Sequence, residues 1–269
     1  MSKPIKNAHL QELHMALNDE GPVALVTGSG APRIGNCVVR RLAAHGYRVI
    51  LHAHRSRAEA TASADELRSQ GIAAGVVLAD LRDEIAVREM TRQAHSLFGR
   101  IDALVNCAGV WRSRRLEEVT AADVREHFEV NALATFLCCQ QIGLIMVEQP
   151  SGGAIVNCGD WAIERPYLHY AAYFPSKGAI PALTRDFAIE LASRNPRVRV
   201  NAVLPGPVMI PESVPDKERR VAIERTLVKR EGSPVNVADA VLFLLGNEFV
   251  TGVCLPVDGG RTIYTAEGR

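Results

Sequence analysis

Seven short and almost uninterrupted apolar runs constrain the fold of this chain more than any other feature. They are VALVTG (23–28), RVILHA (48–53), AAGVVLA (73–79), IDALVNC (101–107), GAIVNC (153–158), VRVNAVL (198–204) and GVCLPV (252–257). Continuous rather than alternating apolar residues are typical of parallel strands that are buried on both faces. Helix-like stretches such as 57–70, 84–98 and 179–194 lie between most of them. The alternation predicts an α/β, doubly wound sheet of about seven parallel strands with helices on both faces.

A length of 269 residues fits one domain of this class. Residues 1–21 are polar and weakly patterned, and we interpret them as an N-terminal extension, either an arm or a surface helix. Residues 22–269 form the predicted domain. The proline-rich segment at about 205–233 interrupts the alternation of strands and helices. Ligands bind beyond the carboxyl ends of the strands in such sheets, so this segment is a candidate substrate loop, a lid or merely a connection.

The composition excludes several classes of partner. A net charge of +1 favours neither nucleic acid nor a membrane surface. We expect no apolar run to approach the roughly 20 residues of a membrane helix, and the first 21 residues lack the apolar core of a secretory signal. The six cysteines are scattered without CxxC pairing, which indicates reduced thiols. We therefore expect a cytoplasmic protein with no bound metal.

A glycine-containing turn, TGSGAPRIG (27–35), joins the first strand to the first helix. Gly28, Gly30 and Gly35 permit a tight turn and a close approach of the backbone to a pyrophosphate. The helix that follows offers free N–H groups and a partial positive charge. In this context the turn predicts a dinucleotide site; the alternative is that the glycines only shape the turn.

The second strand ends in His54, Arg55 and Ser56. A site that selects NAD usually carries an acid here, whereas an arginine accommodates the 2′-phosphate of NADP. Ser56 can donate a hydrogen bond to the same phosphate, and Arg33 in the glycine turn is within reach of a phosphate. These residues favour NADP, unless Arg55 is only a solvated surface charge.

A tyrosine, Tyr173, precedes a lysine, Lys177, by four positions, so both side chains lie on one helix face. Pro175 between them is tolerated only in a first helical turn. The pair is then at a helix start, where the helix dipole and the lysine charge are expected to lower the pKa of Tyr173. Asp160 lies thirteen positions before Tyr173. We interpret the three as a catalytic set; the alternative is a packed tyrosine beside a surface lysine.

These motifs together resemble the short-chain dehydrogenase/reductase family, over residues 22–264. The resemblance is carried by TGSGAPRIG, ADL (79–81), NCAG (106–109), VNAL (130–133), the Tyr173–Lys177 pair, LPGPV (204–208) and TGVCLPVDGG (251–260). It implies a single-domain Rossmann-type fold, a nicotinamide cofactor and a homotetramer.

The resemblance also implies site residues. The catalytic residues would be Asp160, Tyr173, Lys177 and Asn131, with Asn131 holding a water in the proton relay. Substrate-binding residues would be Arg33, Trp111, Asp160 and Tyr173. The cofactor NADPH or NADP would contact Gly28, Gly30, Arg33, Ile34, Gly35, His54, Arg55, Ser56, Asp80, Leu81, Asn106, Ala108, Gly109, Tyr173, Lys177, Pro205, Gly206 and Val208.

Several residues depart from the usual family pattern, and most of them are similar to the pteridine reductase branch. These are Arg33, HAHRS (52–56), and Asp160 in the place of the usual serine. Trp111 follows the fourth strand, where that branch has an aromatic residue that stacks on the pterin. The glycine turn is one residue longer than usual, and Pro175 does not match that branch.

The carboxyl group of Asp160 suggests the kind of substrate. Ionised, it accepts a hydrogen bond; protonated in a partly apolar site, it can pass a proton to a ring nitrogen. A serine suits a plain ketone. The sequence therefore favours an NADPH-dependent reductase of a pterin or similar C=N heterocycle. Two alternatives stay open: a carbonyl reductase that acts on a ketone, and a non-catalytic NADP-binding regulator in which Asp160 marks a decayed site.

Overall fold

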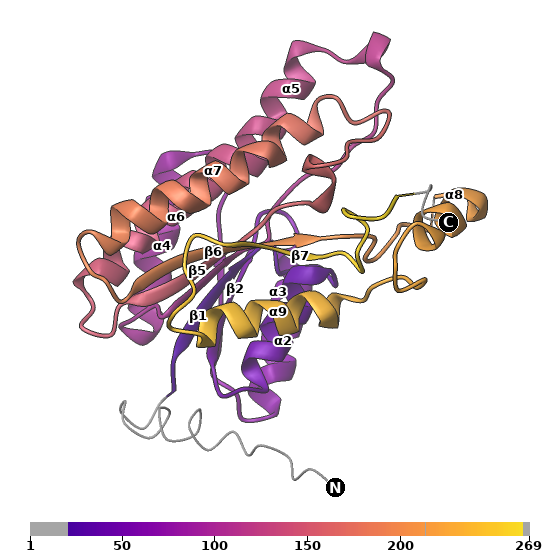
Figure 1. Cartoon of the computed structure of the whole chain (residues 1–269). Coiled ribbons are helices and arrows are strands. Elements are labelled where there is room, and N and C mark those ends of the chain that lie inside the picture. The colour runs from indigo at the N-terminus through magenta and orange to yellow at the C-terminus, as the bar shows by residue number, and fades with distance from the viewer. Residues whose placement is uncertain (1–20, 213, 266–269) are drawn as a thin grey trace, which may run out of the picture.

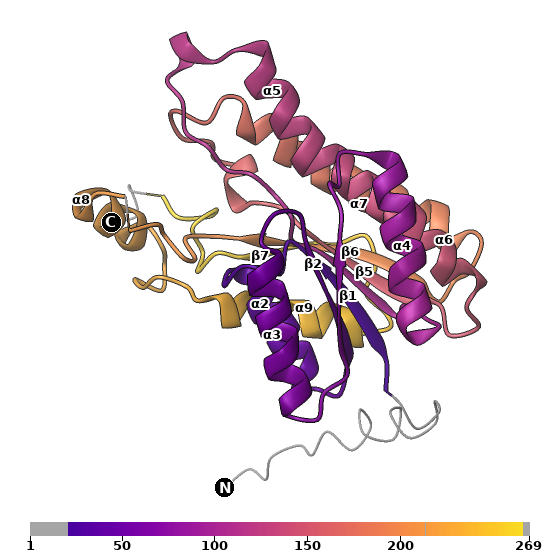
Figure 2. The same cartoon turned by 180° about the vertical axis from the view of Figure 1, so that it is seen from behind.

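The computed structural model describes residues 21–212 and 214–265, and the predicted extension at 1–21 lies almost wholly outside this range. The seven predicted strands form one parallel sheet in the order β3-β2-β1-β4-β5-β6-β7. Figures 1 and 2 show the sheet between two layers of helices. The strands are β1 (Val23–Thr27), β2 (Arg48–Ala53), β3 (Ala74–Leu78), β4 (Ala103–Asn106), β5 (Gly153–Cys158), β6 (Val198–Pro205) and β7 (Cys254–Val257).

The predicted burial of the strands on both faces holds across the centre of the sheet. Every residue of β1 and of β6 is buried, while the edge strand β7 is partly exposed. Parallel strands need crossover connections, and here helices supply most of them. The fold class predicted from the sequence, a doubly wound α/β sheet, is therefore confirmed.

Two helical layers bury the two faces of the sheet. One contains α2 (Ile34–Ala43), α3 (Arg57–Ser69) and α9 (Pro234–Gly246). The other contains α4 (Glu84–Phe98), α6 (Ala134–Glu148) and α7 (Tyr173–Ala192), with α5 (Ala121–His127) leading into α6. Local signals set the helix ends. Asp83 caps α4 by accepting hydrogen bonds from the N–H groups of Ile85 and Ala86, and Gly99 ends it in the left-handed conformation, at φ 73°.

Two boundaries differ from the sequence interpretation. Helix α7 begins at Tyr173 rather than at residue 179, so Pro175 does lie in a first helical turn, as its lack of an N–H group requires. The proline-rich segment 205–233 is not wholly irregular, because it contains α8 (Asp216–Glu224). In both views α8 lies at the edge of the molecule beyond β6 and β7.

The expectation that the chain contains no apolar run of membrane-spanning length was wrong, as judged by the length and composition of one helical run. The helical run Ala121–Glu148 is long and apolar enough to pass such a test. It joins α5 and α6 through a π-helical turn (Phe128–Leu133), and more than half of its most apolar window is buried inside the protein. It packs against α4 and α7, as the core helix of a folded domain does.

Candidate active site

The residues that the sequence singles out lie close together in the structure. They come from the carboxyl ends of β1, β4 and β5 and from the start of α7. Asp160 follows β5 and begins a short 3-10 turn (Trp161–Ile163), where its Oδ1 accepts a hydrogen bond of 2.8 Å from the N–H of Ala162. Its Oδ2 accepts a hydrogen bond of 2.7 Å from the hydroxyl of Tyr173. The backbone of the 3-10 turn therefore fixes the carboxyl group, which in turn orients the tyrosine.

Burial governs the protonation of this pair. It raises the pKa of Asp160, against the opposing effects of the Tyr173 and Ala162 hydrogen bonds. Burial, the nearby Asp160 charge and the hydrogen bond to it also raise the pKa of Tyr173. The predicted lowering of the Tyr173 pKa is therefore wrong, because burial and the neighbouring carboxylate both oppose the charged phenolate. A carboxyl group with a raised pKa is a better proton donor near neutral pH.

Lys177 lies one turn along α7 and is largely buried. Its Nζ donates a hydrogen bond of 2.7 Å to the carbonyl of Cys158, the last residue of β5. This bond directs the ammonium group toward the carboxyl edge of the sheet. A Cβ added at Gly109 would lie 3.6 Å from the same Nζ, so the segment after β4 passes directly beside it.

Asn131 occupies the π-helical turn before α6 and is fully buried. Its side chain accepts a hydrogen bond of 2.8 Å from the Val110 N–H and donates one of 3.0 Å to the Val110 carbonyl. It donates another of 2.9 Å to the Ser176 hydroxyl. Asn131 thus ties the loop after β4 to the first turn of α7. Its expected role in holding a relay water stays a prediction.

Aromatic side chains that contact one another lie beside the predicted catalytic residues. Trp111 is 40% exposed and stacks on Tyr170, with ring centroids 4.9 Å apart. Tyr170 in turn meets the edge of Tyr173 at 6.2 Å. Trp111 therefore lies on the side of the site where the sequence expects substrate, already paired with a second ring. Sequence reasoning missed Tyr170 and its neighbour Tyr167, although the aromatic residues of 167–174 were a signal.

The glycine turn is packed too tightly for side chains. Gly28 has φ 63°, and a Cβ there would lie 2.7 Å from the Cα of Ala108. A Cβ at Gly35 would lie 2.8 Å from the carbonyl oxygen of Gly28, and one at Gly30 would lie 2.6 Å from the Ser56 hydroxyl. Helix α2 begins immediately after this turn at Ile34, so its free N–H groups face the turn.

His52 is a residue of this site that the sequence analysis did not single out. Its Nδ1 accepts a hydrogen bond of 3.1 Å from the Gly28 N–H, and its Nε2 lies 3.2 Å from the carbonyl of Ala79. Burial lowers the pKa of His52 to about 4, so the ring is neutral and Nε2 carries its proton. The ring therefore connects the glycine turn to the residue that follows β3. A histidine inside the otherwise apolar run VILHA of β2 was the available signal.

The predicted 2′-phosphate residues gather at the carboxyl edge of β2. His54 and Arg55 are exposed, and Ser56 is the N-cap residue of α3. Within residues 21–212 and 214–265, neither Arg55 nor Arg33 forms an ion pair. Two unpaired cations beside a helix start are suited to an anionic ligand.

The other predicted cofactor contacts lie at the same edge of the sheet. Asp80 is held by the Arg82 guanidinium, whose hydrogen bonds lower the Asp80 pKa to about 2, and it lies 3.8 Å from Nε2 of His54. The side chain of Asn106 points instead into the core, where it donates to Asn157 at 2.9 Å. Most of the remaining members follow strand ends: Leu81 follows β3, Ala108 and Gly109 follow β4, and Pro205 ends β6 just before Gly206 and Val208.

Comparison with known proteins agrees with this geometry. The family described as Enoyl-(Acyl carrier protein) reductase matches residues 30–262. The (2S)-[(R)-hydroxy(phenyl)methyl]succinyl-CoA dehydrogenase subunit BbsD of Thauera aromatica is 34% identical, over 90% of this chain and 97% of that protein. Pteridine reductase 1 of Leishmania tarentolae is 32% identical, over 94% of this chain and 100% of that protein.

Two solved structures are similar over nearly the whole domain. The blue fluorescent protein from a metagenomic library, solved in complex with NADPH, is 34% identical, with a TM-score of 0.82 over 90% of this chain and 98% of that one. A short-chain dehydrogenase/reductase from Serratia marcescens is 32% identical, with a TM-score of 0.82 and the same coverage of 90% and 98%. The chain therefore belongs to the short-chain dehydrogenase/reductase family of oxidoreductases.

Proposed function

We propose that this protein is an NADPH-dependent reductase of a pterin or a similar C=N heterocycle. The observation that carries the proposal is the 2.7 Å hydrogen bond between the Tyr173 hydroxyl and the buried Asp160 carboxyl group. A carboxyl group with a raised pKa supplies a proton to a ring nitrogen, which a serine hydroxyl does poorly. The similarity to pteridine reductase 1 over the whole of that protein supports the same substrate class.

The residues divide the chemistry between them. NADPH, when bound, supplies a hydride to the carbon of the C=N bond. Asp160 delivers a proton to the ring nitrogen and is reprotonated from solvent, while the Tyr173 hydroxyl holds the carboxyl group in place through their hydrogen bond. Lys177 positions the reacting edge from the first turn of α7. Trp111, stacked on Tyr170, offers a flat surface for the heterocycle, and Arg33 contacts the ring from the glycine turn.

The preference for NADPH over NADH rests on charge. Arg33 and Arg55 have no ion-pair partner in the described part of the chain, and Ser56 offers a hydroxyl between them and α3. No acidic residue stands at the end of β2, where one would bind the ribose of NAD. The NADPH bound to the structurally similar blue fluorescent protein supports this choice.

A ketone is the second candidate substrate, and a specific observation favours it. The related Thauera aromatica protein is named as a dehydrogenase of a hydroxy compound, whose oxidised form is a ketone. Tyr173 can donate its proton to a carbonyl oxygen in that case, with Asp160 as the acceptor that orients it. A regulator that binds NADP without turnover is the third candidate, although all members of the catalytic set are retained.

The test is the loss of NADPH absorbance with a panel of dihydropterins and dihydrofolate and, in parallel, a panel of ketones. Turnover of the heterocycles that is abolished by Tyr173→Phe supports the proposal. Turnover of ketones alone contradicts it in favour of a carbonyl reductase. Tight NADP binding with no turnover on either panel contradicts it in favour of the regulator.

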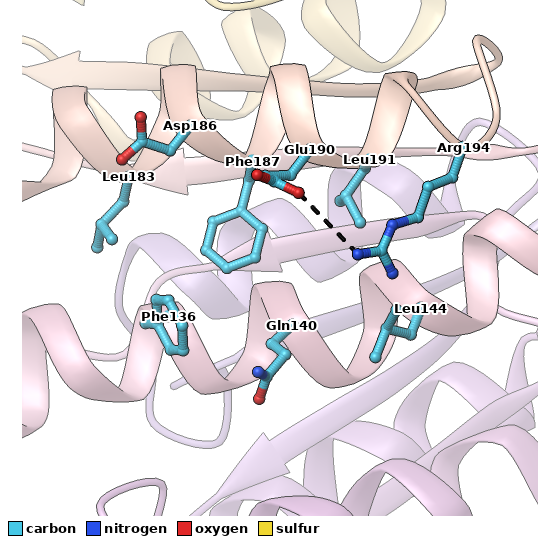
Figure 3. Close-up of a pocket in the computed structure, with 9 residues that line it drawn as sticks. All are labelled: Phe136, Gln140, Leu144, Leu183, Asp186, Phe187, Glu190, Leu191 and Arg194. Carbon is cyan, nitrogen blue, oxygen red and sulfur yellow. Dashed lines mark ion pairs between the residues drawn. The ribbon is translucent and has the colours of Figure 1, made fainter.

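We also propose that the protein is a cytoplasmic homotetramer. Helices α6 and α7 form an apolar groove that includes Phe136, Leu144, Phe187 and Leu191, as Figure 3 shows. Phe136 and Leu144 are 38% and 40% exposed. The charged residues that line the groove all come from α7; they are Asp186 and the pair Glu190–Arg194. An exposed apolar face of this kind suits a second copy of the chain. Light scattering of the wild type and of a Phe136→Glu variant tests the assembly.

A further inference from the structure

Two cysteines lie side by side at the floor of the proposed cofactor site. Strands β4 and β5 pair in parallel with Asn106 opposite Asn157, which places the next residues, Cys107 and Cys158, opposite each other. Both side chains pack on the face of the sheet that α2 and α9 cover, and the two thiols are close enough to shift each other's pKa. All six cysteines are free, and these two are neighbours at the ends of adjacent strands.

The surroundings of the pair connect it to both halves of the site. A Cβ at Gly35 would lie 3.2 Å from the Cβ of Cys107, so Cys107 packs directly under the glycine turn. The carbonyl of Cys158 accepts the hydrogen bond from Lys177. Both residues are partly exposed, whereas Cys138 and Cys139 are fully buried. A small oxidant such as peroxide therefore has a shorter path to the first pair than to the second.

We infer that Cys107 and Cys158 form a redox modification site, which a peroxide converts to a disulfide that weakens cofactor binding. Adjacent strands lie about 4.8 Å apart, within the usual Cα–Cα range of disulfides, roughly 4.4–6.8 Å. Bridging the two thiols therefore requires only a local adjustment of the backbone. The effect on the cofactor rests on the proposed function, but the formation of the disulfide does not.

The reaction is balanced with hydrogen peroxide as the oxidant. The Cys158 sulfur attacks one peroxide oxygen, the O–O bond breaks, and a sulfenic acid and one water form. The Cys107 sulfur then attacks the Cys158 sulfur and displaces a second water, which leaves the S–S bond. Cys158 is the attacking thiol because the neighbouring Cys107 thiol lowers its pKa and Lys177, which donates to the Cys158 carbonyl, acts in the same direction, against burial and the Asp160 charge.

The disulfide would act on the cofactor through the segment after β4. The N–H groups of Cys107 and Ala108 both donate to the hydroxyl of Thr27, at 3.1 and 3.2 Å, and the Cα of Ala108 would lie only 2.7 Å from a Cβ at Gly28. This segment therefore has no free space beside the glycine turn. Drawing Cys107 toward β5 displaces the backbone that supports the turn, and a bound dinucleotide should in turn slow the oxidation.

The experiment treats the full chain with hydrogen peroxide, maps disulfides by peptide mass spectrometry and measures NADPH affinity by fluorescence before and after reduction with dithiothreitol. We expect a Cys107–Cys158 cross-linked peptide, and an affinity that falls by roughly 5- to 150-fold, the usual range of coupling between two sites. Dithiothreitol should restore the affinity. Cys107→Ser and Cys158→Ser should be resistant, while Cys37→Ser, which removes a lone partly exposed thiol on α2, should respond like the wild type.

Two outcomes would overturn the inference. One is that the cross-linked peptide is absent from peroxide-treated wild-type protein in which other exposed thiols have been oxidised. The other is a cross-linked protein that binds NADPH as well as the reduced form does. If the reduced protein does not bind NADPH at all, the proposed cofactor is wrong, and the peptide map still decides whether the modification site exists.

Discussion

Replacing Asp160 by serine tests the proposed chemistry most directly. The change restores the hydroxyl that most family members carry at this position while removing the carboxyl group that accepts the Tyr173 hydrogen bond. The fold should survive, because a serine can still accept the hydrogen bond from the Ala162 N–H and begin the 3-10 turn. Asp160→Asn is the matched control, since it keeps the shape of the carboxyl group but cannot transfer a proton.

The expected effects on the two substrate classes have opposite signs. For a pterin, both variants lose the proton donor, and turnover should fall by about 10²-fold or more. For a ketone, Tyr173 must give up its proton, and the bonded carboxylate opposes this. A charge-assisted hydrogen bond is worth about 1.5–3 kcal/mol. This hydrogen bond stabilises the protonated Tyr173 before it reacts. If the bond is fully lost in the transition state, a variant that lacks it should reduce the ketone faster, by on the order of 10- to 100-fold.

The pH dependence supplies an independent measurement. Burial raises the pKa of Asp160, so the protonated form persists to higher pH than for an exposed aspartate. Pterin reduction by the wild type should therefore fall as pH rises through this raised pKa, and the serine variant should lack that limb. The assay is the initial rate of NADPH oxidation from acidic to alkaline pH. Unchanged pterin turnover and an unchanged pH profile in Asp160→Ser would refute the reasoning.

Four further substitutions have defined outcomes. Tyr173→Phe should lower kcat by roughly 10²–10⁴-fold while NADPH affinity, measured by fluorescence, stays near that of the wild type. Arg55→Asp should raise the KM for NADPH by about tenfold or more relative to NADH, and equal effects on both cofactors would argue against a phosphate contact. Trp111→Ala should weaken substrate binding several-fold with little change in Tm, since the ring is 40% exposed; the reverse pattern would indicate a packing role. Gly28→Ala should cost about 1–3 kcal/mol in denaturant unfolding, whereas Gly178→Ala, where a Cβ meets nothing within 4 Å, should not destabilise the protein.

Local sequence patterns determined the architecture of this protein. All seven strands were predictable from their apolar runs. At the centre of the sheet, as in β1 and β6, the runs are continuous because a strand that is buried on both faces must be apolar throughout. The glycine turn was equally readable, since positive φ at Gly28 and close packing at Gly35 leave few other residues possible. Pro175 even marked the first turn of α7, because proline lacks the N–H group that later turns require.

Only the tertiary structure decided the protonation chemistry and the partners of the site residues. The pKa of Tyr173 was predicted to fall, yet it rises, because burial and a carboxyl group thirteen residues away in sequence both act on it. The contacts of His52 with Gly28 and of Cys107 with Cys158 join different strands, so no local pattern contains them. Electrostatic interactions depend on distance and on the exclusion of water, and the fold sets both.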